Sequence, residues 1–290
     1  MEVAVLGAGS RGRTVTRRCV GAGHSVRLYA DDANAVMDSV DAVERALPAA
    51  PVTDRVRATT GLASAVEGAE FVVDTTDGGT DDRRALVAEV ETMVEERTLI
   101  ATGDSTVSVT AVAAGLKRPG RAVGLQFDEY DGSRLVEVVL ADQTTGETRD
   151  RAVSFVETLD CVPIVVADTP GLATRRLAFA RLAEAIRMAQ AGVASVPDID
   201  RAATRGADTR GPLARADELG LDRVRDGLAD LAATLGDRFE PPDLLVEAVE
   251  SGRLGRRTGE GFYVWTEGEP TEGSDLVPGG PTTSEGFDGR

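Results

Sequence analysis

Lysine and histidine are almost missing from this chain of 290 residues. Lys117 is the one lysine and His24 the one histidine, while 49 Asp and Glu outnumber 32 Lys and Arg, which gives a net charge of −17. Such a negative surface repels phosphate backbones and anionic lipid head groups, so the composition argues against a nucleic-acid or membrane-surface role. The preference for arginine in an acidic chain also resembles halophilic proteins, because a Debye length of about 3 Å at 1 M salt weakens repulsion between carboxylates. An ordinary acidic protein is the alternative.

Cysteine and long apolar runs are scarce as well. Cys19 and Cys161 stand far apart and match no CxxC or Cys/His spacing, so we expect neither a metal site nor an obligatory disulfide. No apolar run reaches the roughly 18 to 20 residues of a membrane span, and the residues after Met1 lack the features of a signal peptide. These absences predict a cytoplasmic protein.

The first half of the chain alternates short apolar runs with amphipathic stretches, which is typical of a parallel sheet with helical crossovers. Strands are expected at 2–6, 25–29, 55–58, 71–74, 98–101, 122–127, 135–140 and 162–166. Apolar positions three and four apart predict helices at 11–20, 33–47, 81–95, 109–116 and 147–159. The predicted fold class is α/β, with a doubly wound Rossmann-type domain over residues 1–169.

The pattern changes at the turn pair Pro170-Gly171, after which only helices are expected, beginning with 172–191. We predict a smaller all-helical domain over 170–266. The residues beyond it are Glu, Gly, Pro, Ser and Thr without periodicity, which predicts a disordered acidic tail over 267–290.

A glycine-rich loop joins the first strand to the first helix. Glycines in this order permit a tight turn, close approach of backbone N–H groups to a pyrophosphate, and close packing of helix on strand. The loop lies within a βαβ unit, as a dinucleotide site requires, whereas a merely structural glycine turn is the alternative. The residues expected to bind the cofactor here are Gly7, Ala8, Gly9, Ser10, Arg11 and Gly12.

The second strand ends in two acidic residues that bear on the choice of cofactor. A carboxylate at this place accepts a hydrogen bond from the ribose 2′-hydroxyl of NAD, and Asp31 and Asp32 together repel the 2′-phosphate of NADP. NAD is therefore favoured, with Asp31 as the ribose ligand. The alternative is that both carboxylates simply cap the helix that begins near residue 33. Thr75 and Thr76, directly after the strand 71–74, complete the predicted cofactor-binding set.

Several motifs together resemble one family, the short-chain L-3-hydroxyacyl-CoA dehydrogenases, over nearly all of residues 1–265. The motifs are the glycine-rich loop, Leu135-Val136-Glu137-Val138-Val139, Pro170-Gly171, Gly211-Pro212-Leu213 and Gly261-Phe262-Tyr263. The resemblance implies NAD as cofactor, a small-molecule substrate, and a helical second domain that closes the substrate cleft and forms a homodimer. No metal is implied.

The same resemblance supplies the expected catalytic residues. Oxidation of a secondary alcohol needs a base for the hydroxyl proton, while the nicotinamide takes the hydride. In the family a histidine held by a glutamate is that base, and a serine and an asparagine orient the substrate oxygen. Matching of motifs places the glutamate at Glu137 and the serine at Ser105, but the histidine at Gln126 and the asparagine at Arg175.

The usual dyad is therefore incomplete. An amide such as that of Gln126 does not titrate near neutrality. His24 lies in the turn before the second strand and Lys117 lies beyond a helix end, so neither is expected to replace the missing base.

Other assignments stay open. A carboxylate with a raised pKa could act as the base, at Glu137, Asp128 or Glu129, while Ser105 polarises the substrate oxygen. Ser105 could also be only a turn residue, and Glu137 the remnant of a lost dyad. Arg175 either recruits a substrate carboxylate or is solvated. The corresponding functions are an NAD-dependent 3-hydroxyacyl-CoA dehydrogenase, a dehydrogenase for another hydroxy acid, and a catalytically impaired NAD-binding paralogue with a regulatory or structural role.

Overall fold

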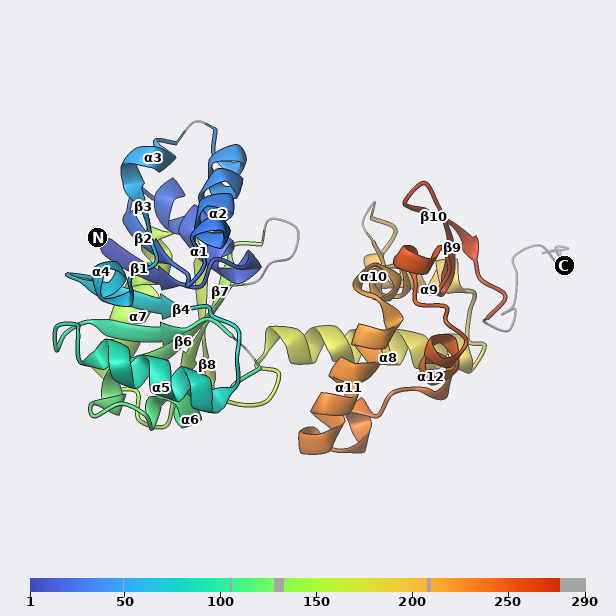
Figure 1. Cartoon of the computed structure of the whole chain (residues 1–290). Coiled ribbons are helices and arrows are strands. Elements are labelled where there is room, and N and C mark those ends of the chain that lie inside the picture. The colour runs from blue at the N-terminus through green and yellow to red at the C-terminus, as the bar shows by residue number, and fades with distance from the viewer. Residues whose placement is uncertain (49, 105, 128–132, 208–209, 277–290) are drawn as a thin grey trace, which may run out of the picture. The chain divides into compact units, whose positions relative to one another are not determined.

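The computed structural model describes residues 1–48, 50–104, 106–127, 133–207 and 210–276. The chain divides into two compact units, Met1–Ala173 and Thr174–Arg290 (Figure 1). The division falls a few residues after the expected position at 169. Each unit has its own apolar core and is described by itself.

The first unit is built on an eight-stranded sheet of order β3-β2-β1-β4-β5-β6-β7-β8. Neighbouring strands are parallel except β6 and β7, which are antiparallel. All eight predicted strands are present, with ends that differ by at most one residue. Their bounds are β1 Glu2–Leu6, β2 Ser25–Tyr29, β3 Val56–Thr59, β4 Phe71–Asp74, β5 Leu99–Thr102, β6 Ala122–Phe127, β7 Leu135–Leu140 and β8 Val162–Ala167.

Helices connect these strands and cover the sheet. Their bounds are α1 Ser10–Gly21, α2 Ala33–Ala46, α3 Val52–Arg55, α4 Leu62–Val66, α5 Thr80–Glu91, α6 Val109–Ala113 and α7 Gly146–Thr158, with a 3₁₀ turn at Pro119–Arg121. The five predicted helices are found, although α5 and α6 end earlier than expected. The short helices α3 and α4 were not predicted, because four or five residues are too few to show a helical period.

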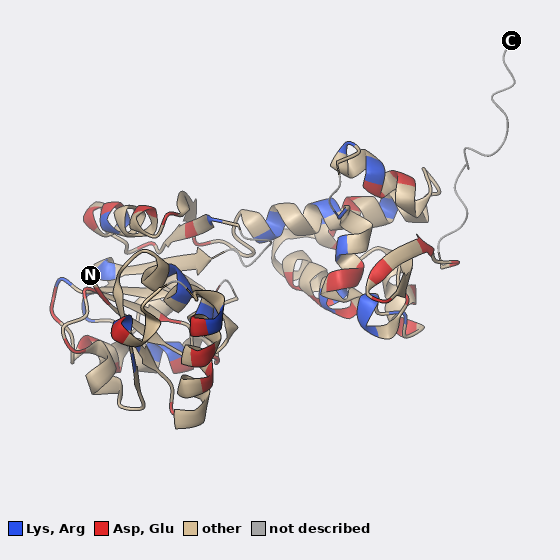
Figure 2. Cartoon of the chain, turned by 90° about the horizontal axis from the view of Figure 1, so that it is seen from above, with Lys and Arg blue, Asp and Glu red and all other residues tan. Residues whose placement is uncertain are grey.

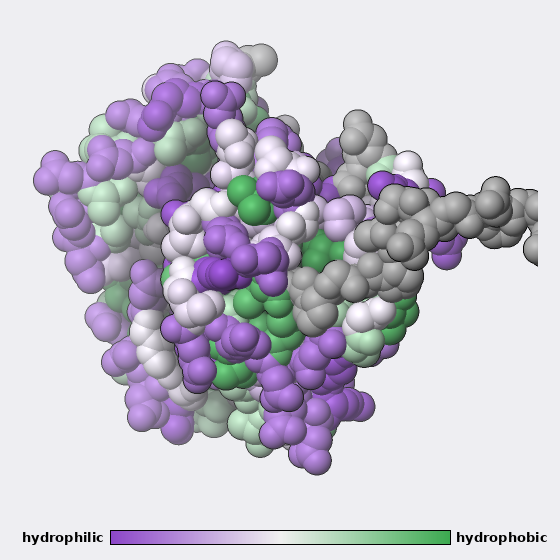
Figure 3. Space-filling model, turned by 90° about the vertical axis from the view of Figure 1, so that its right-hand side faces the viewer, coloured by the Kyte–Doolittle hydropathy of each residue, from purple (hydrophilic) through white to green (hydrophobic). Residues whose placement is uncertain are grey.

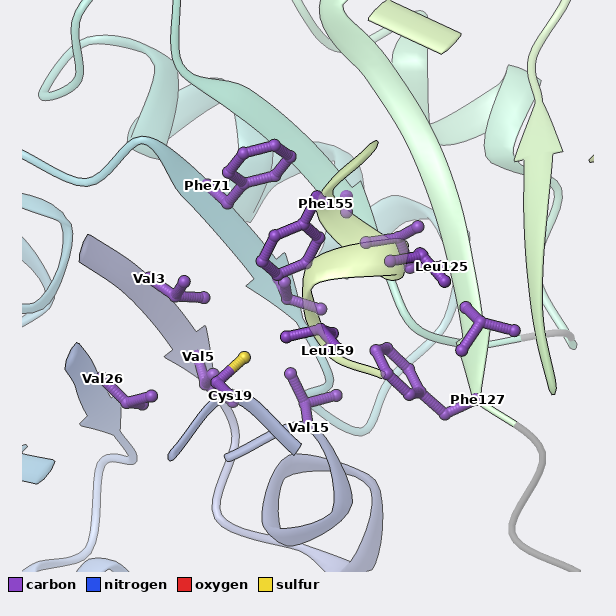
Figure 4. Packing of buried hydrophobic residues seen from close by; sticks show 14 of the residues in the cluster. Val3, Val5, Val15, Cys19, Val26, Phe71, Leu125, Phe127, Phe155 and Leu159 are labelled. Carbon is purple, nitrogen blue, oxygen red and sulfur yellow. The ribbon is translucent and has the colours of Figure 1, made fainter. Parts of the chain in front are cut away.

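Both faces of the sheet are buried because successive strand side chains point to opposite sides. Val3 and Val5 of β1 face one apolar layer, in which Val15 of α1 packs over the sheet and Phe155 of α7 stacks on Phe71 with ring centroids 4.2 Å apart (Figure 4). Ala4 and Leu6 of the same strand face the layer formed with α5 and α6. Continuous apolar strands such as β4 are explained by this double burial.

The second unit contains five helices and a β-hairpin among its described residues. Their bounds are α8 Thr174–Gln190, α9 Val196–Thr204, α10 Pro212–Leu219, α11 Leu221–Leu235, α12 Asp243–Glu250, β9 Tyr263–Thr266 and β10 Glu269–Gly273, with 3₁₀ turns at Asp237–Phe239 and Arg256–Thr258. Asp217 of α10 sets the start of the hairpin, since its carboxylate accepts the backbone N–H groups of Phe262 and Tyr263 and the indole N–H of Trp265, each at 2.9 Å.

The hairpin corrects the expectation of helices alone followed by a tail from residue 267. β10 pairs with β9 through a turn of two residues, Glu267 and Gly268, with φ values of 52° and 85°. Positive φ at both positions matches the twist of a tight hairpin. Ser274 beyond it is buried, with its N–H 2.8 Å from Phe262 O. The strand was missed because its residues are polar and not periodic. Residues 277–290 of the predicted tail lie outside the described residues.

Charged side chains of both signs are spread over both units (Figure 2). On the face seen in Figure 3, hydrophilic residues predominate and hydrophobic ones gather in smaller patches. No helix within the described ranges has the length and apolar character needed to cross a membrane.

Candidate active site

The candidate site lies at the carboxyl edge of the parallel strands. β1, β4, β5 and β6 run in the same direction, so their last residues meet along one edge. The sheet order reverses between β1 and β4, and in such sheets the ligand crevice lies outside the strand ends at that point. The glycine-rich loop, Asp74 and Gln126 all lie at this edge.

The glycine-rich loop has two tightly packed positions and one open one. Gly7 has a φ of 110°, and a Cβ added to it would lie 2.8 Å from the backbone of Thr75. A Cβ on Gly12 would lie 1.9 Å from Gly7 O, whereas one on Gly9 would meet nothing within 4 Å. Gly9 is the N-cap of α1, whose first turn holds no acidic residue. The loop therefore fits the pyrophosphate of a dinucleotide, with free space and helix N–H groups at Gly9 and Ser10.

Thr75 supports this loop from the end of β4, and Thr76 closes a turn on Asp74. Thr75 donates from its N–H and its hydroxyl to Leu6 O, at 2.7 and 2.8 Å. Thr76 donates from its N–H and hydroxyl to Asp74 Oδ1, at 2.9 and 2.6 Å. Both hydroxyl groups thus bond within the protein, and direct contact with a cofactor stays a prediction for these two residues.

The two acidic residues after β2 have different roles. Asp32 Oδ1 accepts the N–H of Asn34 at 2.9 Å and caps α2. Asp31 does not cap the helix: it is exposed, and its Oδ1 accepts a hydrogen bond from the hydroxyl of Tyr29. The alternative in which both carboxylates cap α2 is therefore wrong for Asp31.

A buried arginine that the sequence analysis missed joins the ends of β4 and β5. Arg83 of α5 has no exposed surface, and its Nη1 and Nη2 atoms lie 2.8 Å from Asp74 Oδ2 and Asp104 Oδ2. Each aspartate also accepts two hydrogen bonds from the threonine two residues further on, so the two strand ends form matching turns. In the sequence, the one sign of this network was an acidic residue at or just after the end of each of the two strands, together with an arginine on the predicted helix between them.

Arg11 connects this network to the glycine-rich loop. Its Nη1 lies 2.6 Å from Asp104 Oδ2 and its Nη2 lies 2.9 Å from Asp77 Oδ1. Burial raises the pKa of Asp104, but the hydrogen bonds from Thr106 and the charges of Arg11 and Arg83 outweigh that effect and hold the pKa below its ordinary value. Asp104 therefore remains a carboxylate that neutralises two guanidinium groups.

Gln126 and Glu137 lie directly opposite each other on β6 and β7. Glu137 is 1% exposed, and its Oε1 accepts the N–H of Ala173 at 2.8 Å. The Gln126 amide donates a long hydrogen bond of 3.3 Å to Phe127 O, and its buried Oε1 has no hydrogen-bond partner within the described residues. The antiparallel register thus brings together the two residues that the resemblance placed in the catalytic dyad.

The remaining predicted catalytic residues lie outside the described part of the first unit. Ser105, Asp128 and Glu129 lie outside the described residues. Arg175 belongs to the second unit, where its guanidinium lies 5.2 Å from the ring centroid of Phe179 and its Nη2 lies 3.8 Å from Asp230 Oδ2.

The titrating nitrogen of His24 lies away from the site. His24 precedes β2, at the amino edge of the sheet, and its Nε2 is 2.9 Å from Thr158 Oγ1. Burial lowers its pKa. Within the described ranges, no cluster of His, Cys, Asp and Glu suits a metal ion.

Comparison with known proteins defines the family. Residues 2–169 match the NAD binding domain of 3-hydroxyacyl-CoA dehydrogenase, and residues 171–265 match its C-terminal domain. The chain belongs to the 3-hydroxyacyl-CoA dehydrogenase family, and its cofactor is NAD. The fold class, the family and the cofactor predicted from the sequence are thereby confirmed.

Individual relatives span almost the whole chain. A 3-hydroxybutyryl-CoA dehydrogenase of Clostridioides difficile is 27% identical over 278 residues, which are 91% of this chain and 99% of the relative. The mitochondrial hydroxyacyl-coenzyme A dehydrogenase of Sus scrofa is 29% identical over 284 residues, 90% of each chain. The crystal structure of (S)-3-hydroxybutyryl-CoA dehydrogenase from Ralstonia eutropha has a TM-score of 0.84 at 27% identity and covers 92% of this chain and 99% of that one.

Proposed function

We propose that this protein interconverts a 3-hydroxyacyl-CoA, or a related hydroxy acid, and its 3-keto form with NAD as the redox partner. The supporting observation is the Gln126–Glu137 pair, which places a buried carboxylate beside a hydrogen-bonding amide at the edge that also holds the glycine-rich loop. A carboxylate, which can accept a proton, remains at the site where the family histidine is absent.

In the proposed reaction, NAD held at the glycine-rich loop would supply the hydride acceptor for oxidation of the alcohol. The loop holds the pyrophosphate through Gly9 and Ser10, and Asp31 accepts a hydrogen bond from the adenosine ribose. The Gln126 amide donates to the keto oxygen or accepts from the hydroxyl, because it has both functions. Glu137 removes the hydroxyl proton and returns it in the reverse direction. Ser105 polarises the substrate oxygen.

The experiment that tests this function is an assay of NADH oxidation with acetoacetyl-CoA as the substrate, in concentrated salt. We expect turnover by the wild-type chain, and a faster rate in the Gln126→His variant because a titrating base then adjoins Glu137. The absence of turnover with acetoacetyl-CoA and with free hydroxy or keto acids, in protein that binds NADH, would contradict the proposal.

A catalytically impaired NAD-binding paralogue is the second candidate, and Gln126 at the histidine position is the observation that favours it. In that case the wild-type chain binds NADH without turnover, and Gln126→His gains activity. A dehydrogenase for a hydroxy acid without CoA would instead show turnover with free acids and would lose it in Arg175→Ala.

We further propose a homodimer formed through the second unit, as the family resemblance implies. Leu177 of α8 and Val193, which are 71% and 56% exposed in the single chain, are apolar residues available for such a contact. Light scattering after size-exclusion chromatography should give twice the chain mass, and Leu177→Glu should shift the protein toward the monomer.

A further inference from the structure

Tyr29 contacts two parts of the expected NAD site, the glycine-rich loop and Asp31. It is the last residue of β2, and its carbonyl oxygen accepts the N–H of Gly7 at 2.8 Å, which fixes the first turn of the glycine-rich loop beside it. Its hydroxyl donates to Asp31 Oδ1. Tyr29 thus joins the glycine-rich loop to the carboxylate that is expected to bind the ribose.

We propose that Tyr29 is a positioning residue for cofactor specificity: its hydroxyl holds the Asp31 carboxylate in place to accept the adenosine 2′-hydroxyl of NAD and to exclude the 2′-phosphate of NADP. The proposal concerns cofactor binding and is independent of whether the chain turns over a substrate.

The geometry leaves Asp31 one oxygen for this purpose. Oδ1 is engaged by Tyr29, and across the described ranges Oδ2 has no hydrogen-bond partner. An exposed aspartate on a loop samples several rotamers, and holding one of them in advance reduces the entropy lost on binding. The Tyr29 hydroxyl supplies that restraint from a regular strand.

The ring of Tyr29 is itself held in place. It is partly buried and packs, like Leu62 of α4, against the apolar layer on the α5 face of the sheet. The hydrogen bond to Asp31 raises the pKa of Tyr29 to about 12, so the hydroxyl stays protonated and remains a donor at neutral pH. An ionised carboxylate has no proton to donate, so the hydrogen bond always runs from the Tyr29 hydroxyl to the Asp31 carboxylate.

Asp32 provides a matched control because it carries the same charge as Asp31 but caps α2 instead of contacting Tyr29. Its carboxylate caps α2 through Asn34, and asparagine is an equally good capping residue. Asp32→Asn therefore removes the same charge as Asp31→Asn, one residue away, without removing a ribose ligand.

The test is fluorescence titration of the full-length chain with NADH and with NADPH. For Tyr29→Phe, which keeps the packed ring, we expect the NADH Kd to rise about threefold to tenfold and the NADPH Kd to change less than about twofold. Asp31→Asn should raise the NADH Kd about tenfold or more and lower the NADPH Kd. Adding Tyr29→Phe to Asp31→Asn should change the NADH Kd less than about twofold further, since the hydroxyl acts through the carboxylate.

Three results would overturn the proposal. In the first, Tyr29→Phe raises both constants together, which is what a purely structural role predicts. In the second, Asp32→Asn alters the NADH-to-NADPH ratio as much as Asp31→Asn, which would show a general charge effect. In the third, the wild-type chain shows no preference for NADH. Each is a binding measurement, so failure of the proposed dehydrogenase activity would be seen separately as NADH binding with unchanged specificity and no turnover.

Discussion

The Nη2 atom of Arg83 lies 2.8 Å from Asp104 Oδ2, and both side chains are buried beneath the carboxyl edge of the sheet. Because the other arm of Arg83 binds Asp74, a single guanidinium fixes the turns that follow β4 and β5. Through Asp104 the same network reaches Arg11 in the glycine-rich loop. The glycine-rich loop and the turns after β4 and β5 are therefore held by one network of charges.

Removal of this guanidinium should strongly destabilise the first unit. Arg83→Met leaves two carboxylates buried without their shared partner, and breaking a buried ion pair from one side costs about 3–5 kcal/mol. Urea unfolding should show that loss. Arg84→Met is the control: its ion pair with Asp81 is exposed, so its effect should stay within about 0.5 kcal/mol. A loss below about 1 kcal/mol for Arg83→Met would contradict the structural role of the network.

Acid should weaken the same network. The pKa of Asp104 is lowered in the folded protein, so its carboxylate adds stability that is complete above the ordinary value of 3.8 and is lost as the pH falls through the lower folded value. Asp104→Asn removes this contribution. The difference in unfolding free energy between wild type and variant should therefore be constant near neutral pH and shrink below about pH 4. A difference that is unchanged down to pH 2 would rule out this linkage.

Two glycines of the loop should respond differently to the same methyl group. Gly12→Ala places a Cβ against Gly7 O, so we expect a loss of about 1–3 kcal/mol of stability together with weaker NADH binding. Gly9→Ala has free space, so its stability should be nearly unchanged, but its methyl group would lie where we propose that the pyrophosphate binds and should raise the NADH Kd about tenfold. Thermal unfolding and NADH titration measure the two effects, and full NADH affinity in Gly9→Ala would argue against binding at this turn.

The central strands β1, β4 and β5 could be predicted from the sequence because they are mainly apolar runs bounded by polar or glycine residues, and burial on both faces makes such runs continuous. The antiparallel pairing of β6 and β7 was not predicted, and the meeting of Gln126 and Glu137 was expected only through the family resemblance. Strand direction depends on the length of a connection and not on the residues within the strand.

The hairpin and the buried charges show where sequence reasoning fails. β10 is polar, so no apolar pattern indicates a strand there. Its pairing with β9 follows from the turn geometry at Glu267 and Gly268. An arginine on a helix is usually exposed to solvent, so the sequence alone offers no reason to expect Arg83 to be buried. Its burial depends on the carboxylates of Asp74 and Asp104, which come together only in the folded sheet. The contact of Tyr29 with Asp31 depends on a side-chain rotamer, which residue order does not determine.

The most direct test of the central claim is the rate of NADH oxidation by acetoacetyl-CoA in Glu137→Gln, compared with wild type. The substitution keeps the shape of the side chain and an oxygen that accepts the N–H of Ala173, but it removes the group that takes and returns the proton. If Glu137 is the base, kcat falls about a hundredfold or more while the NADH Kd is unchanged. A variant that retains kcat within about threefold of wild type would contradict the assignment.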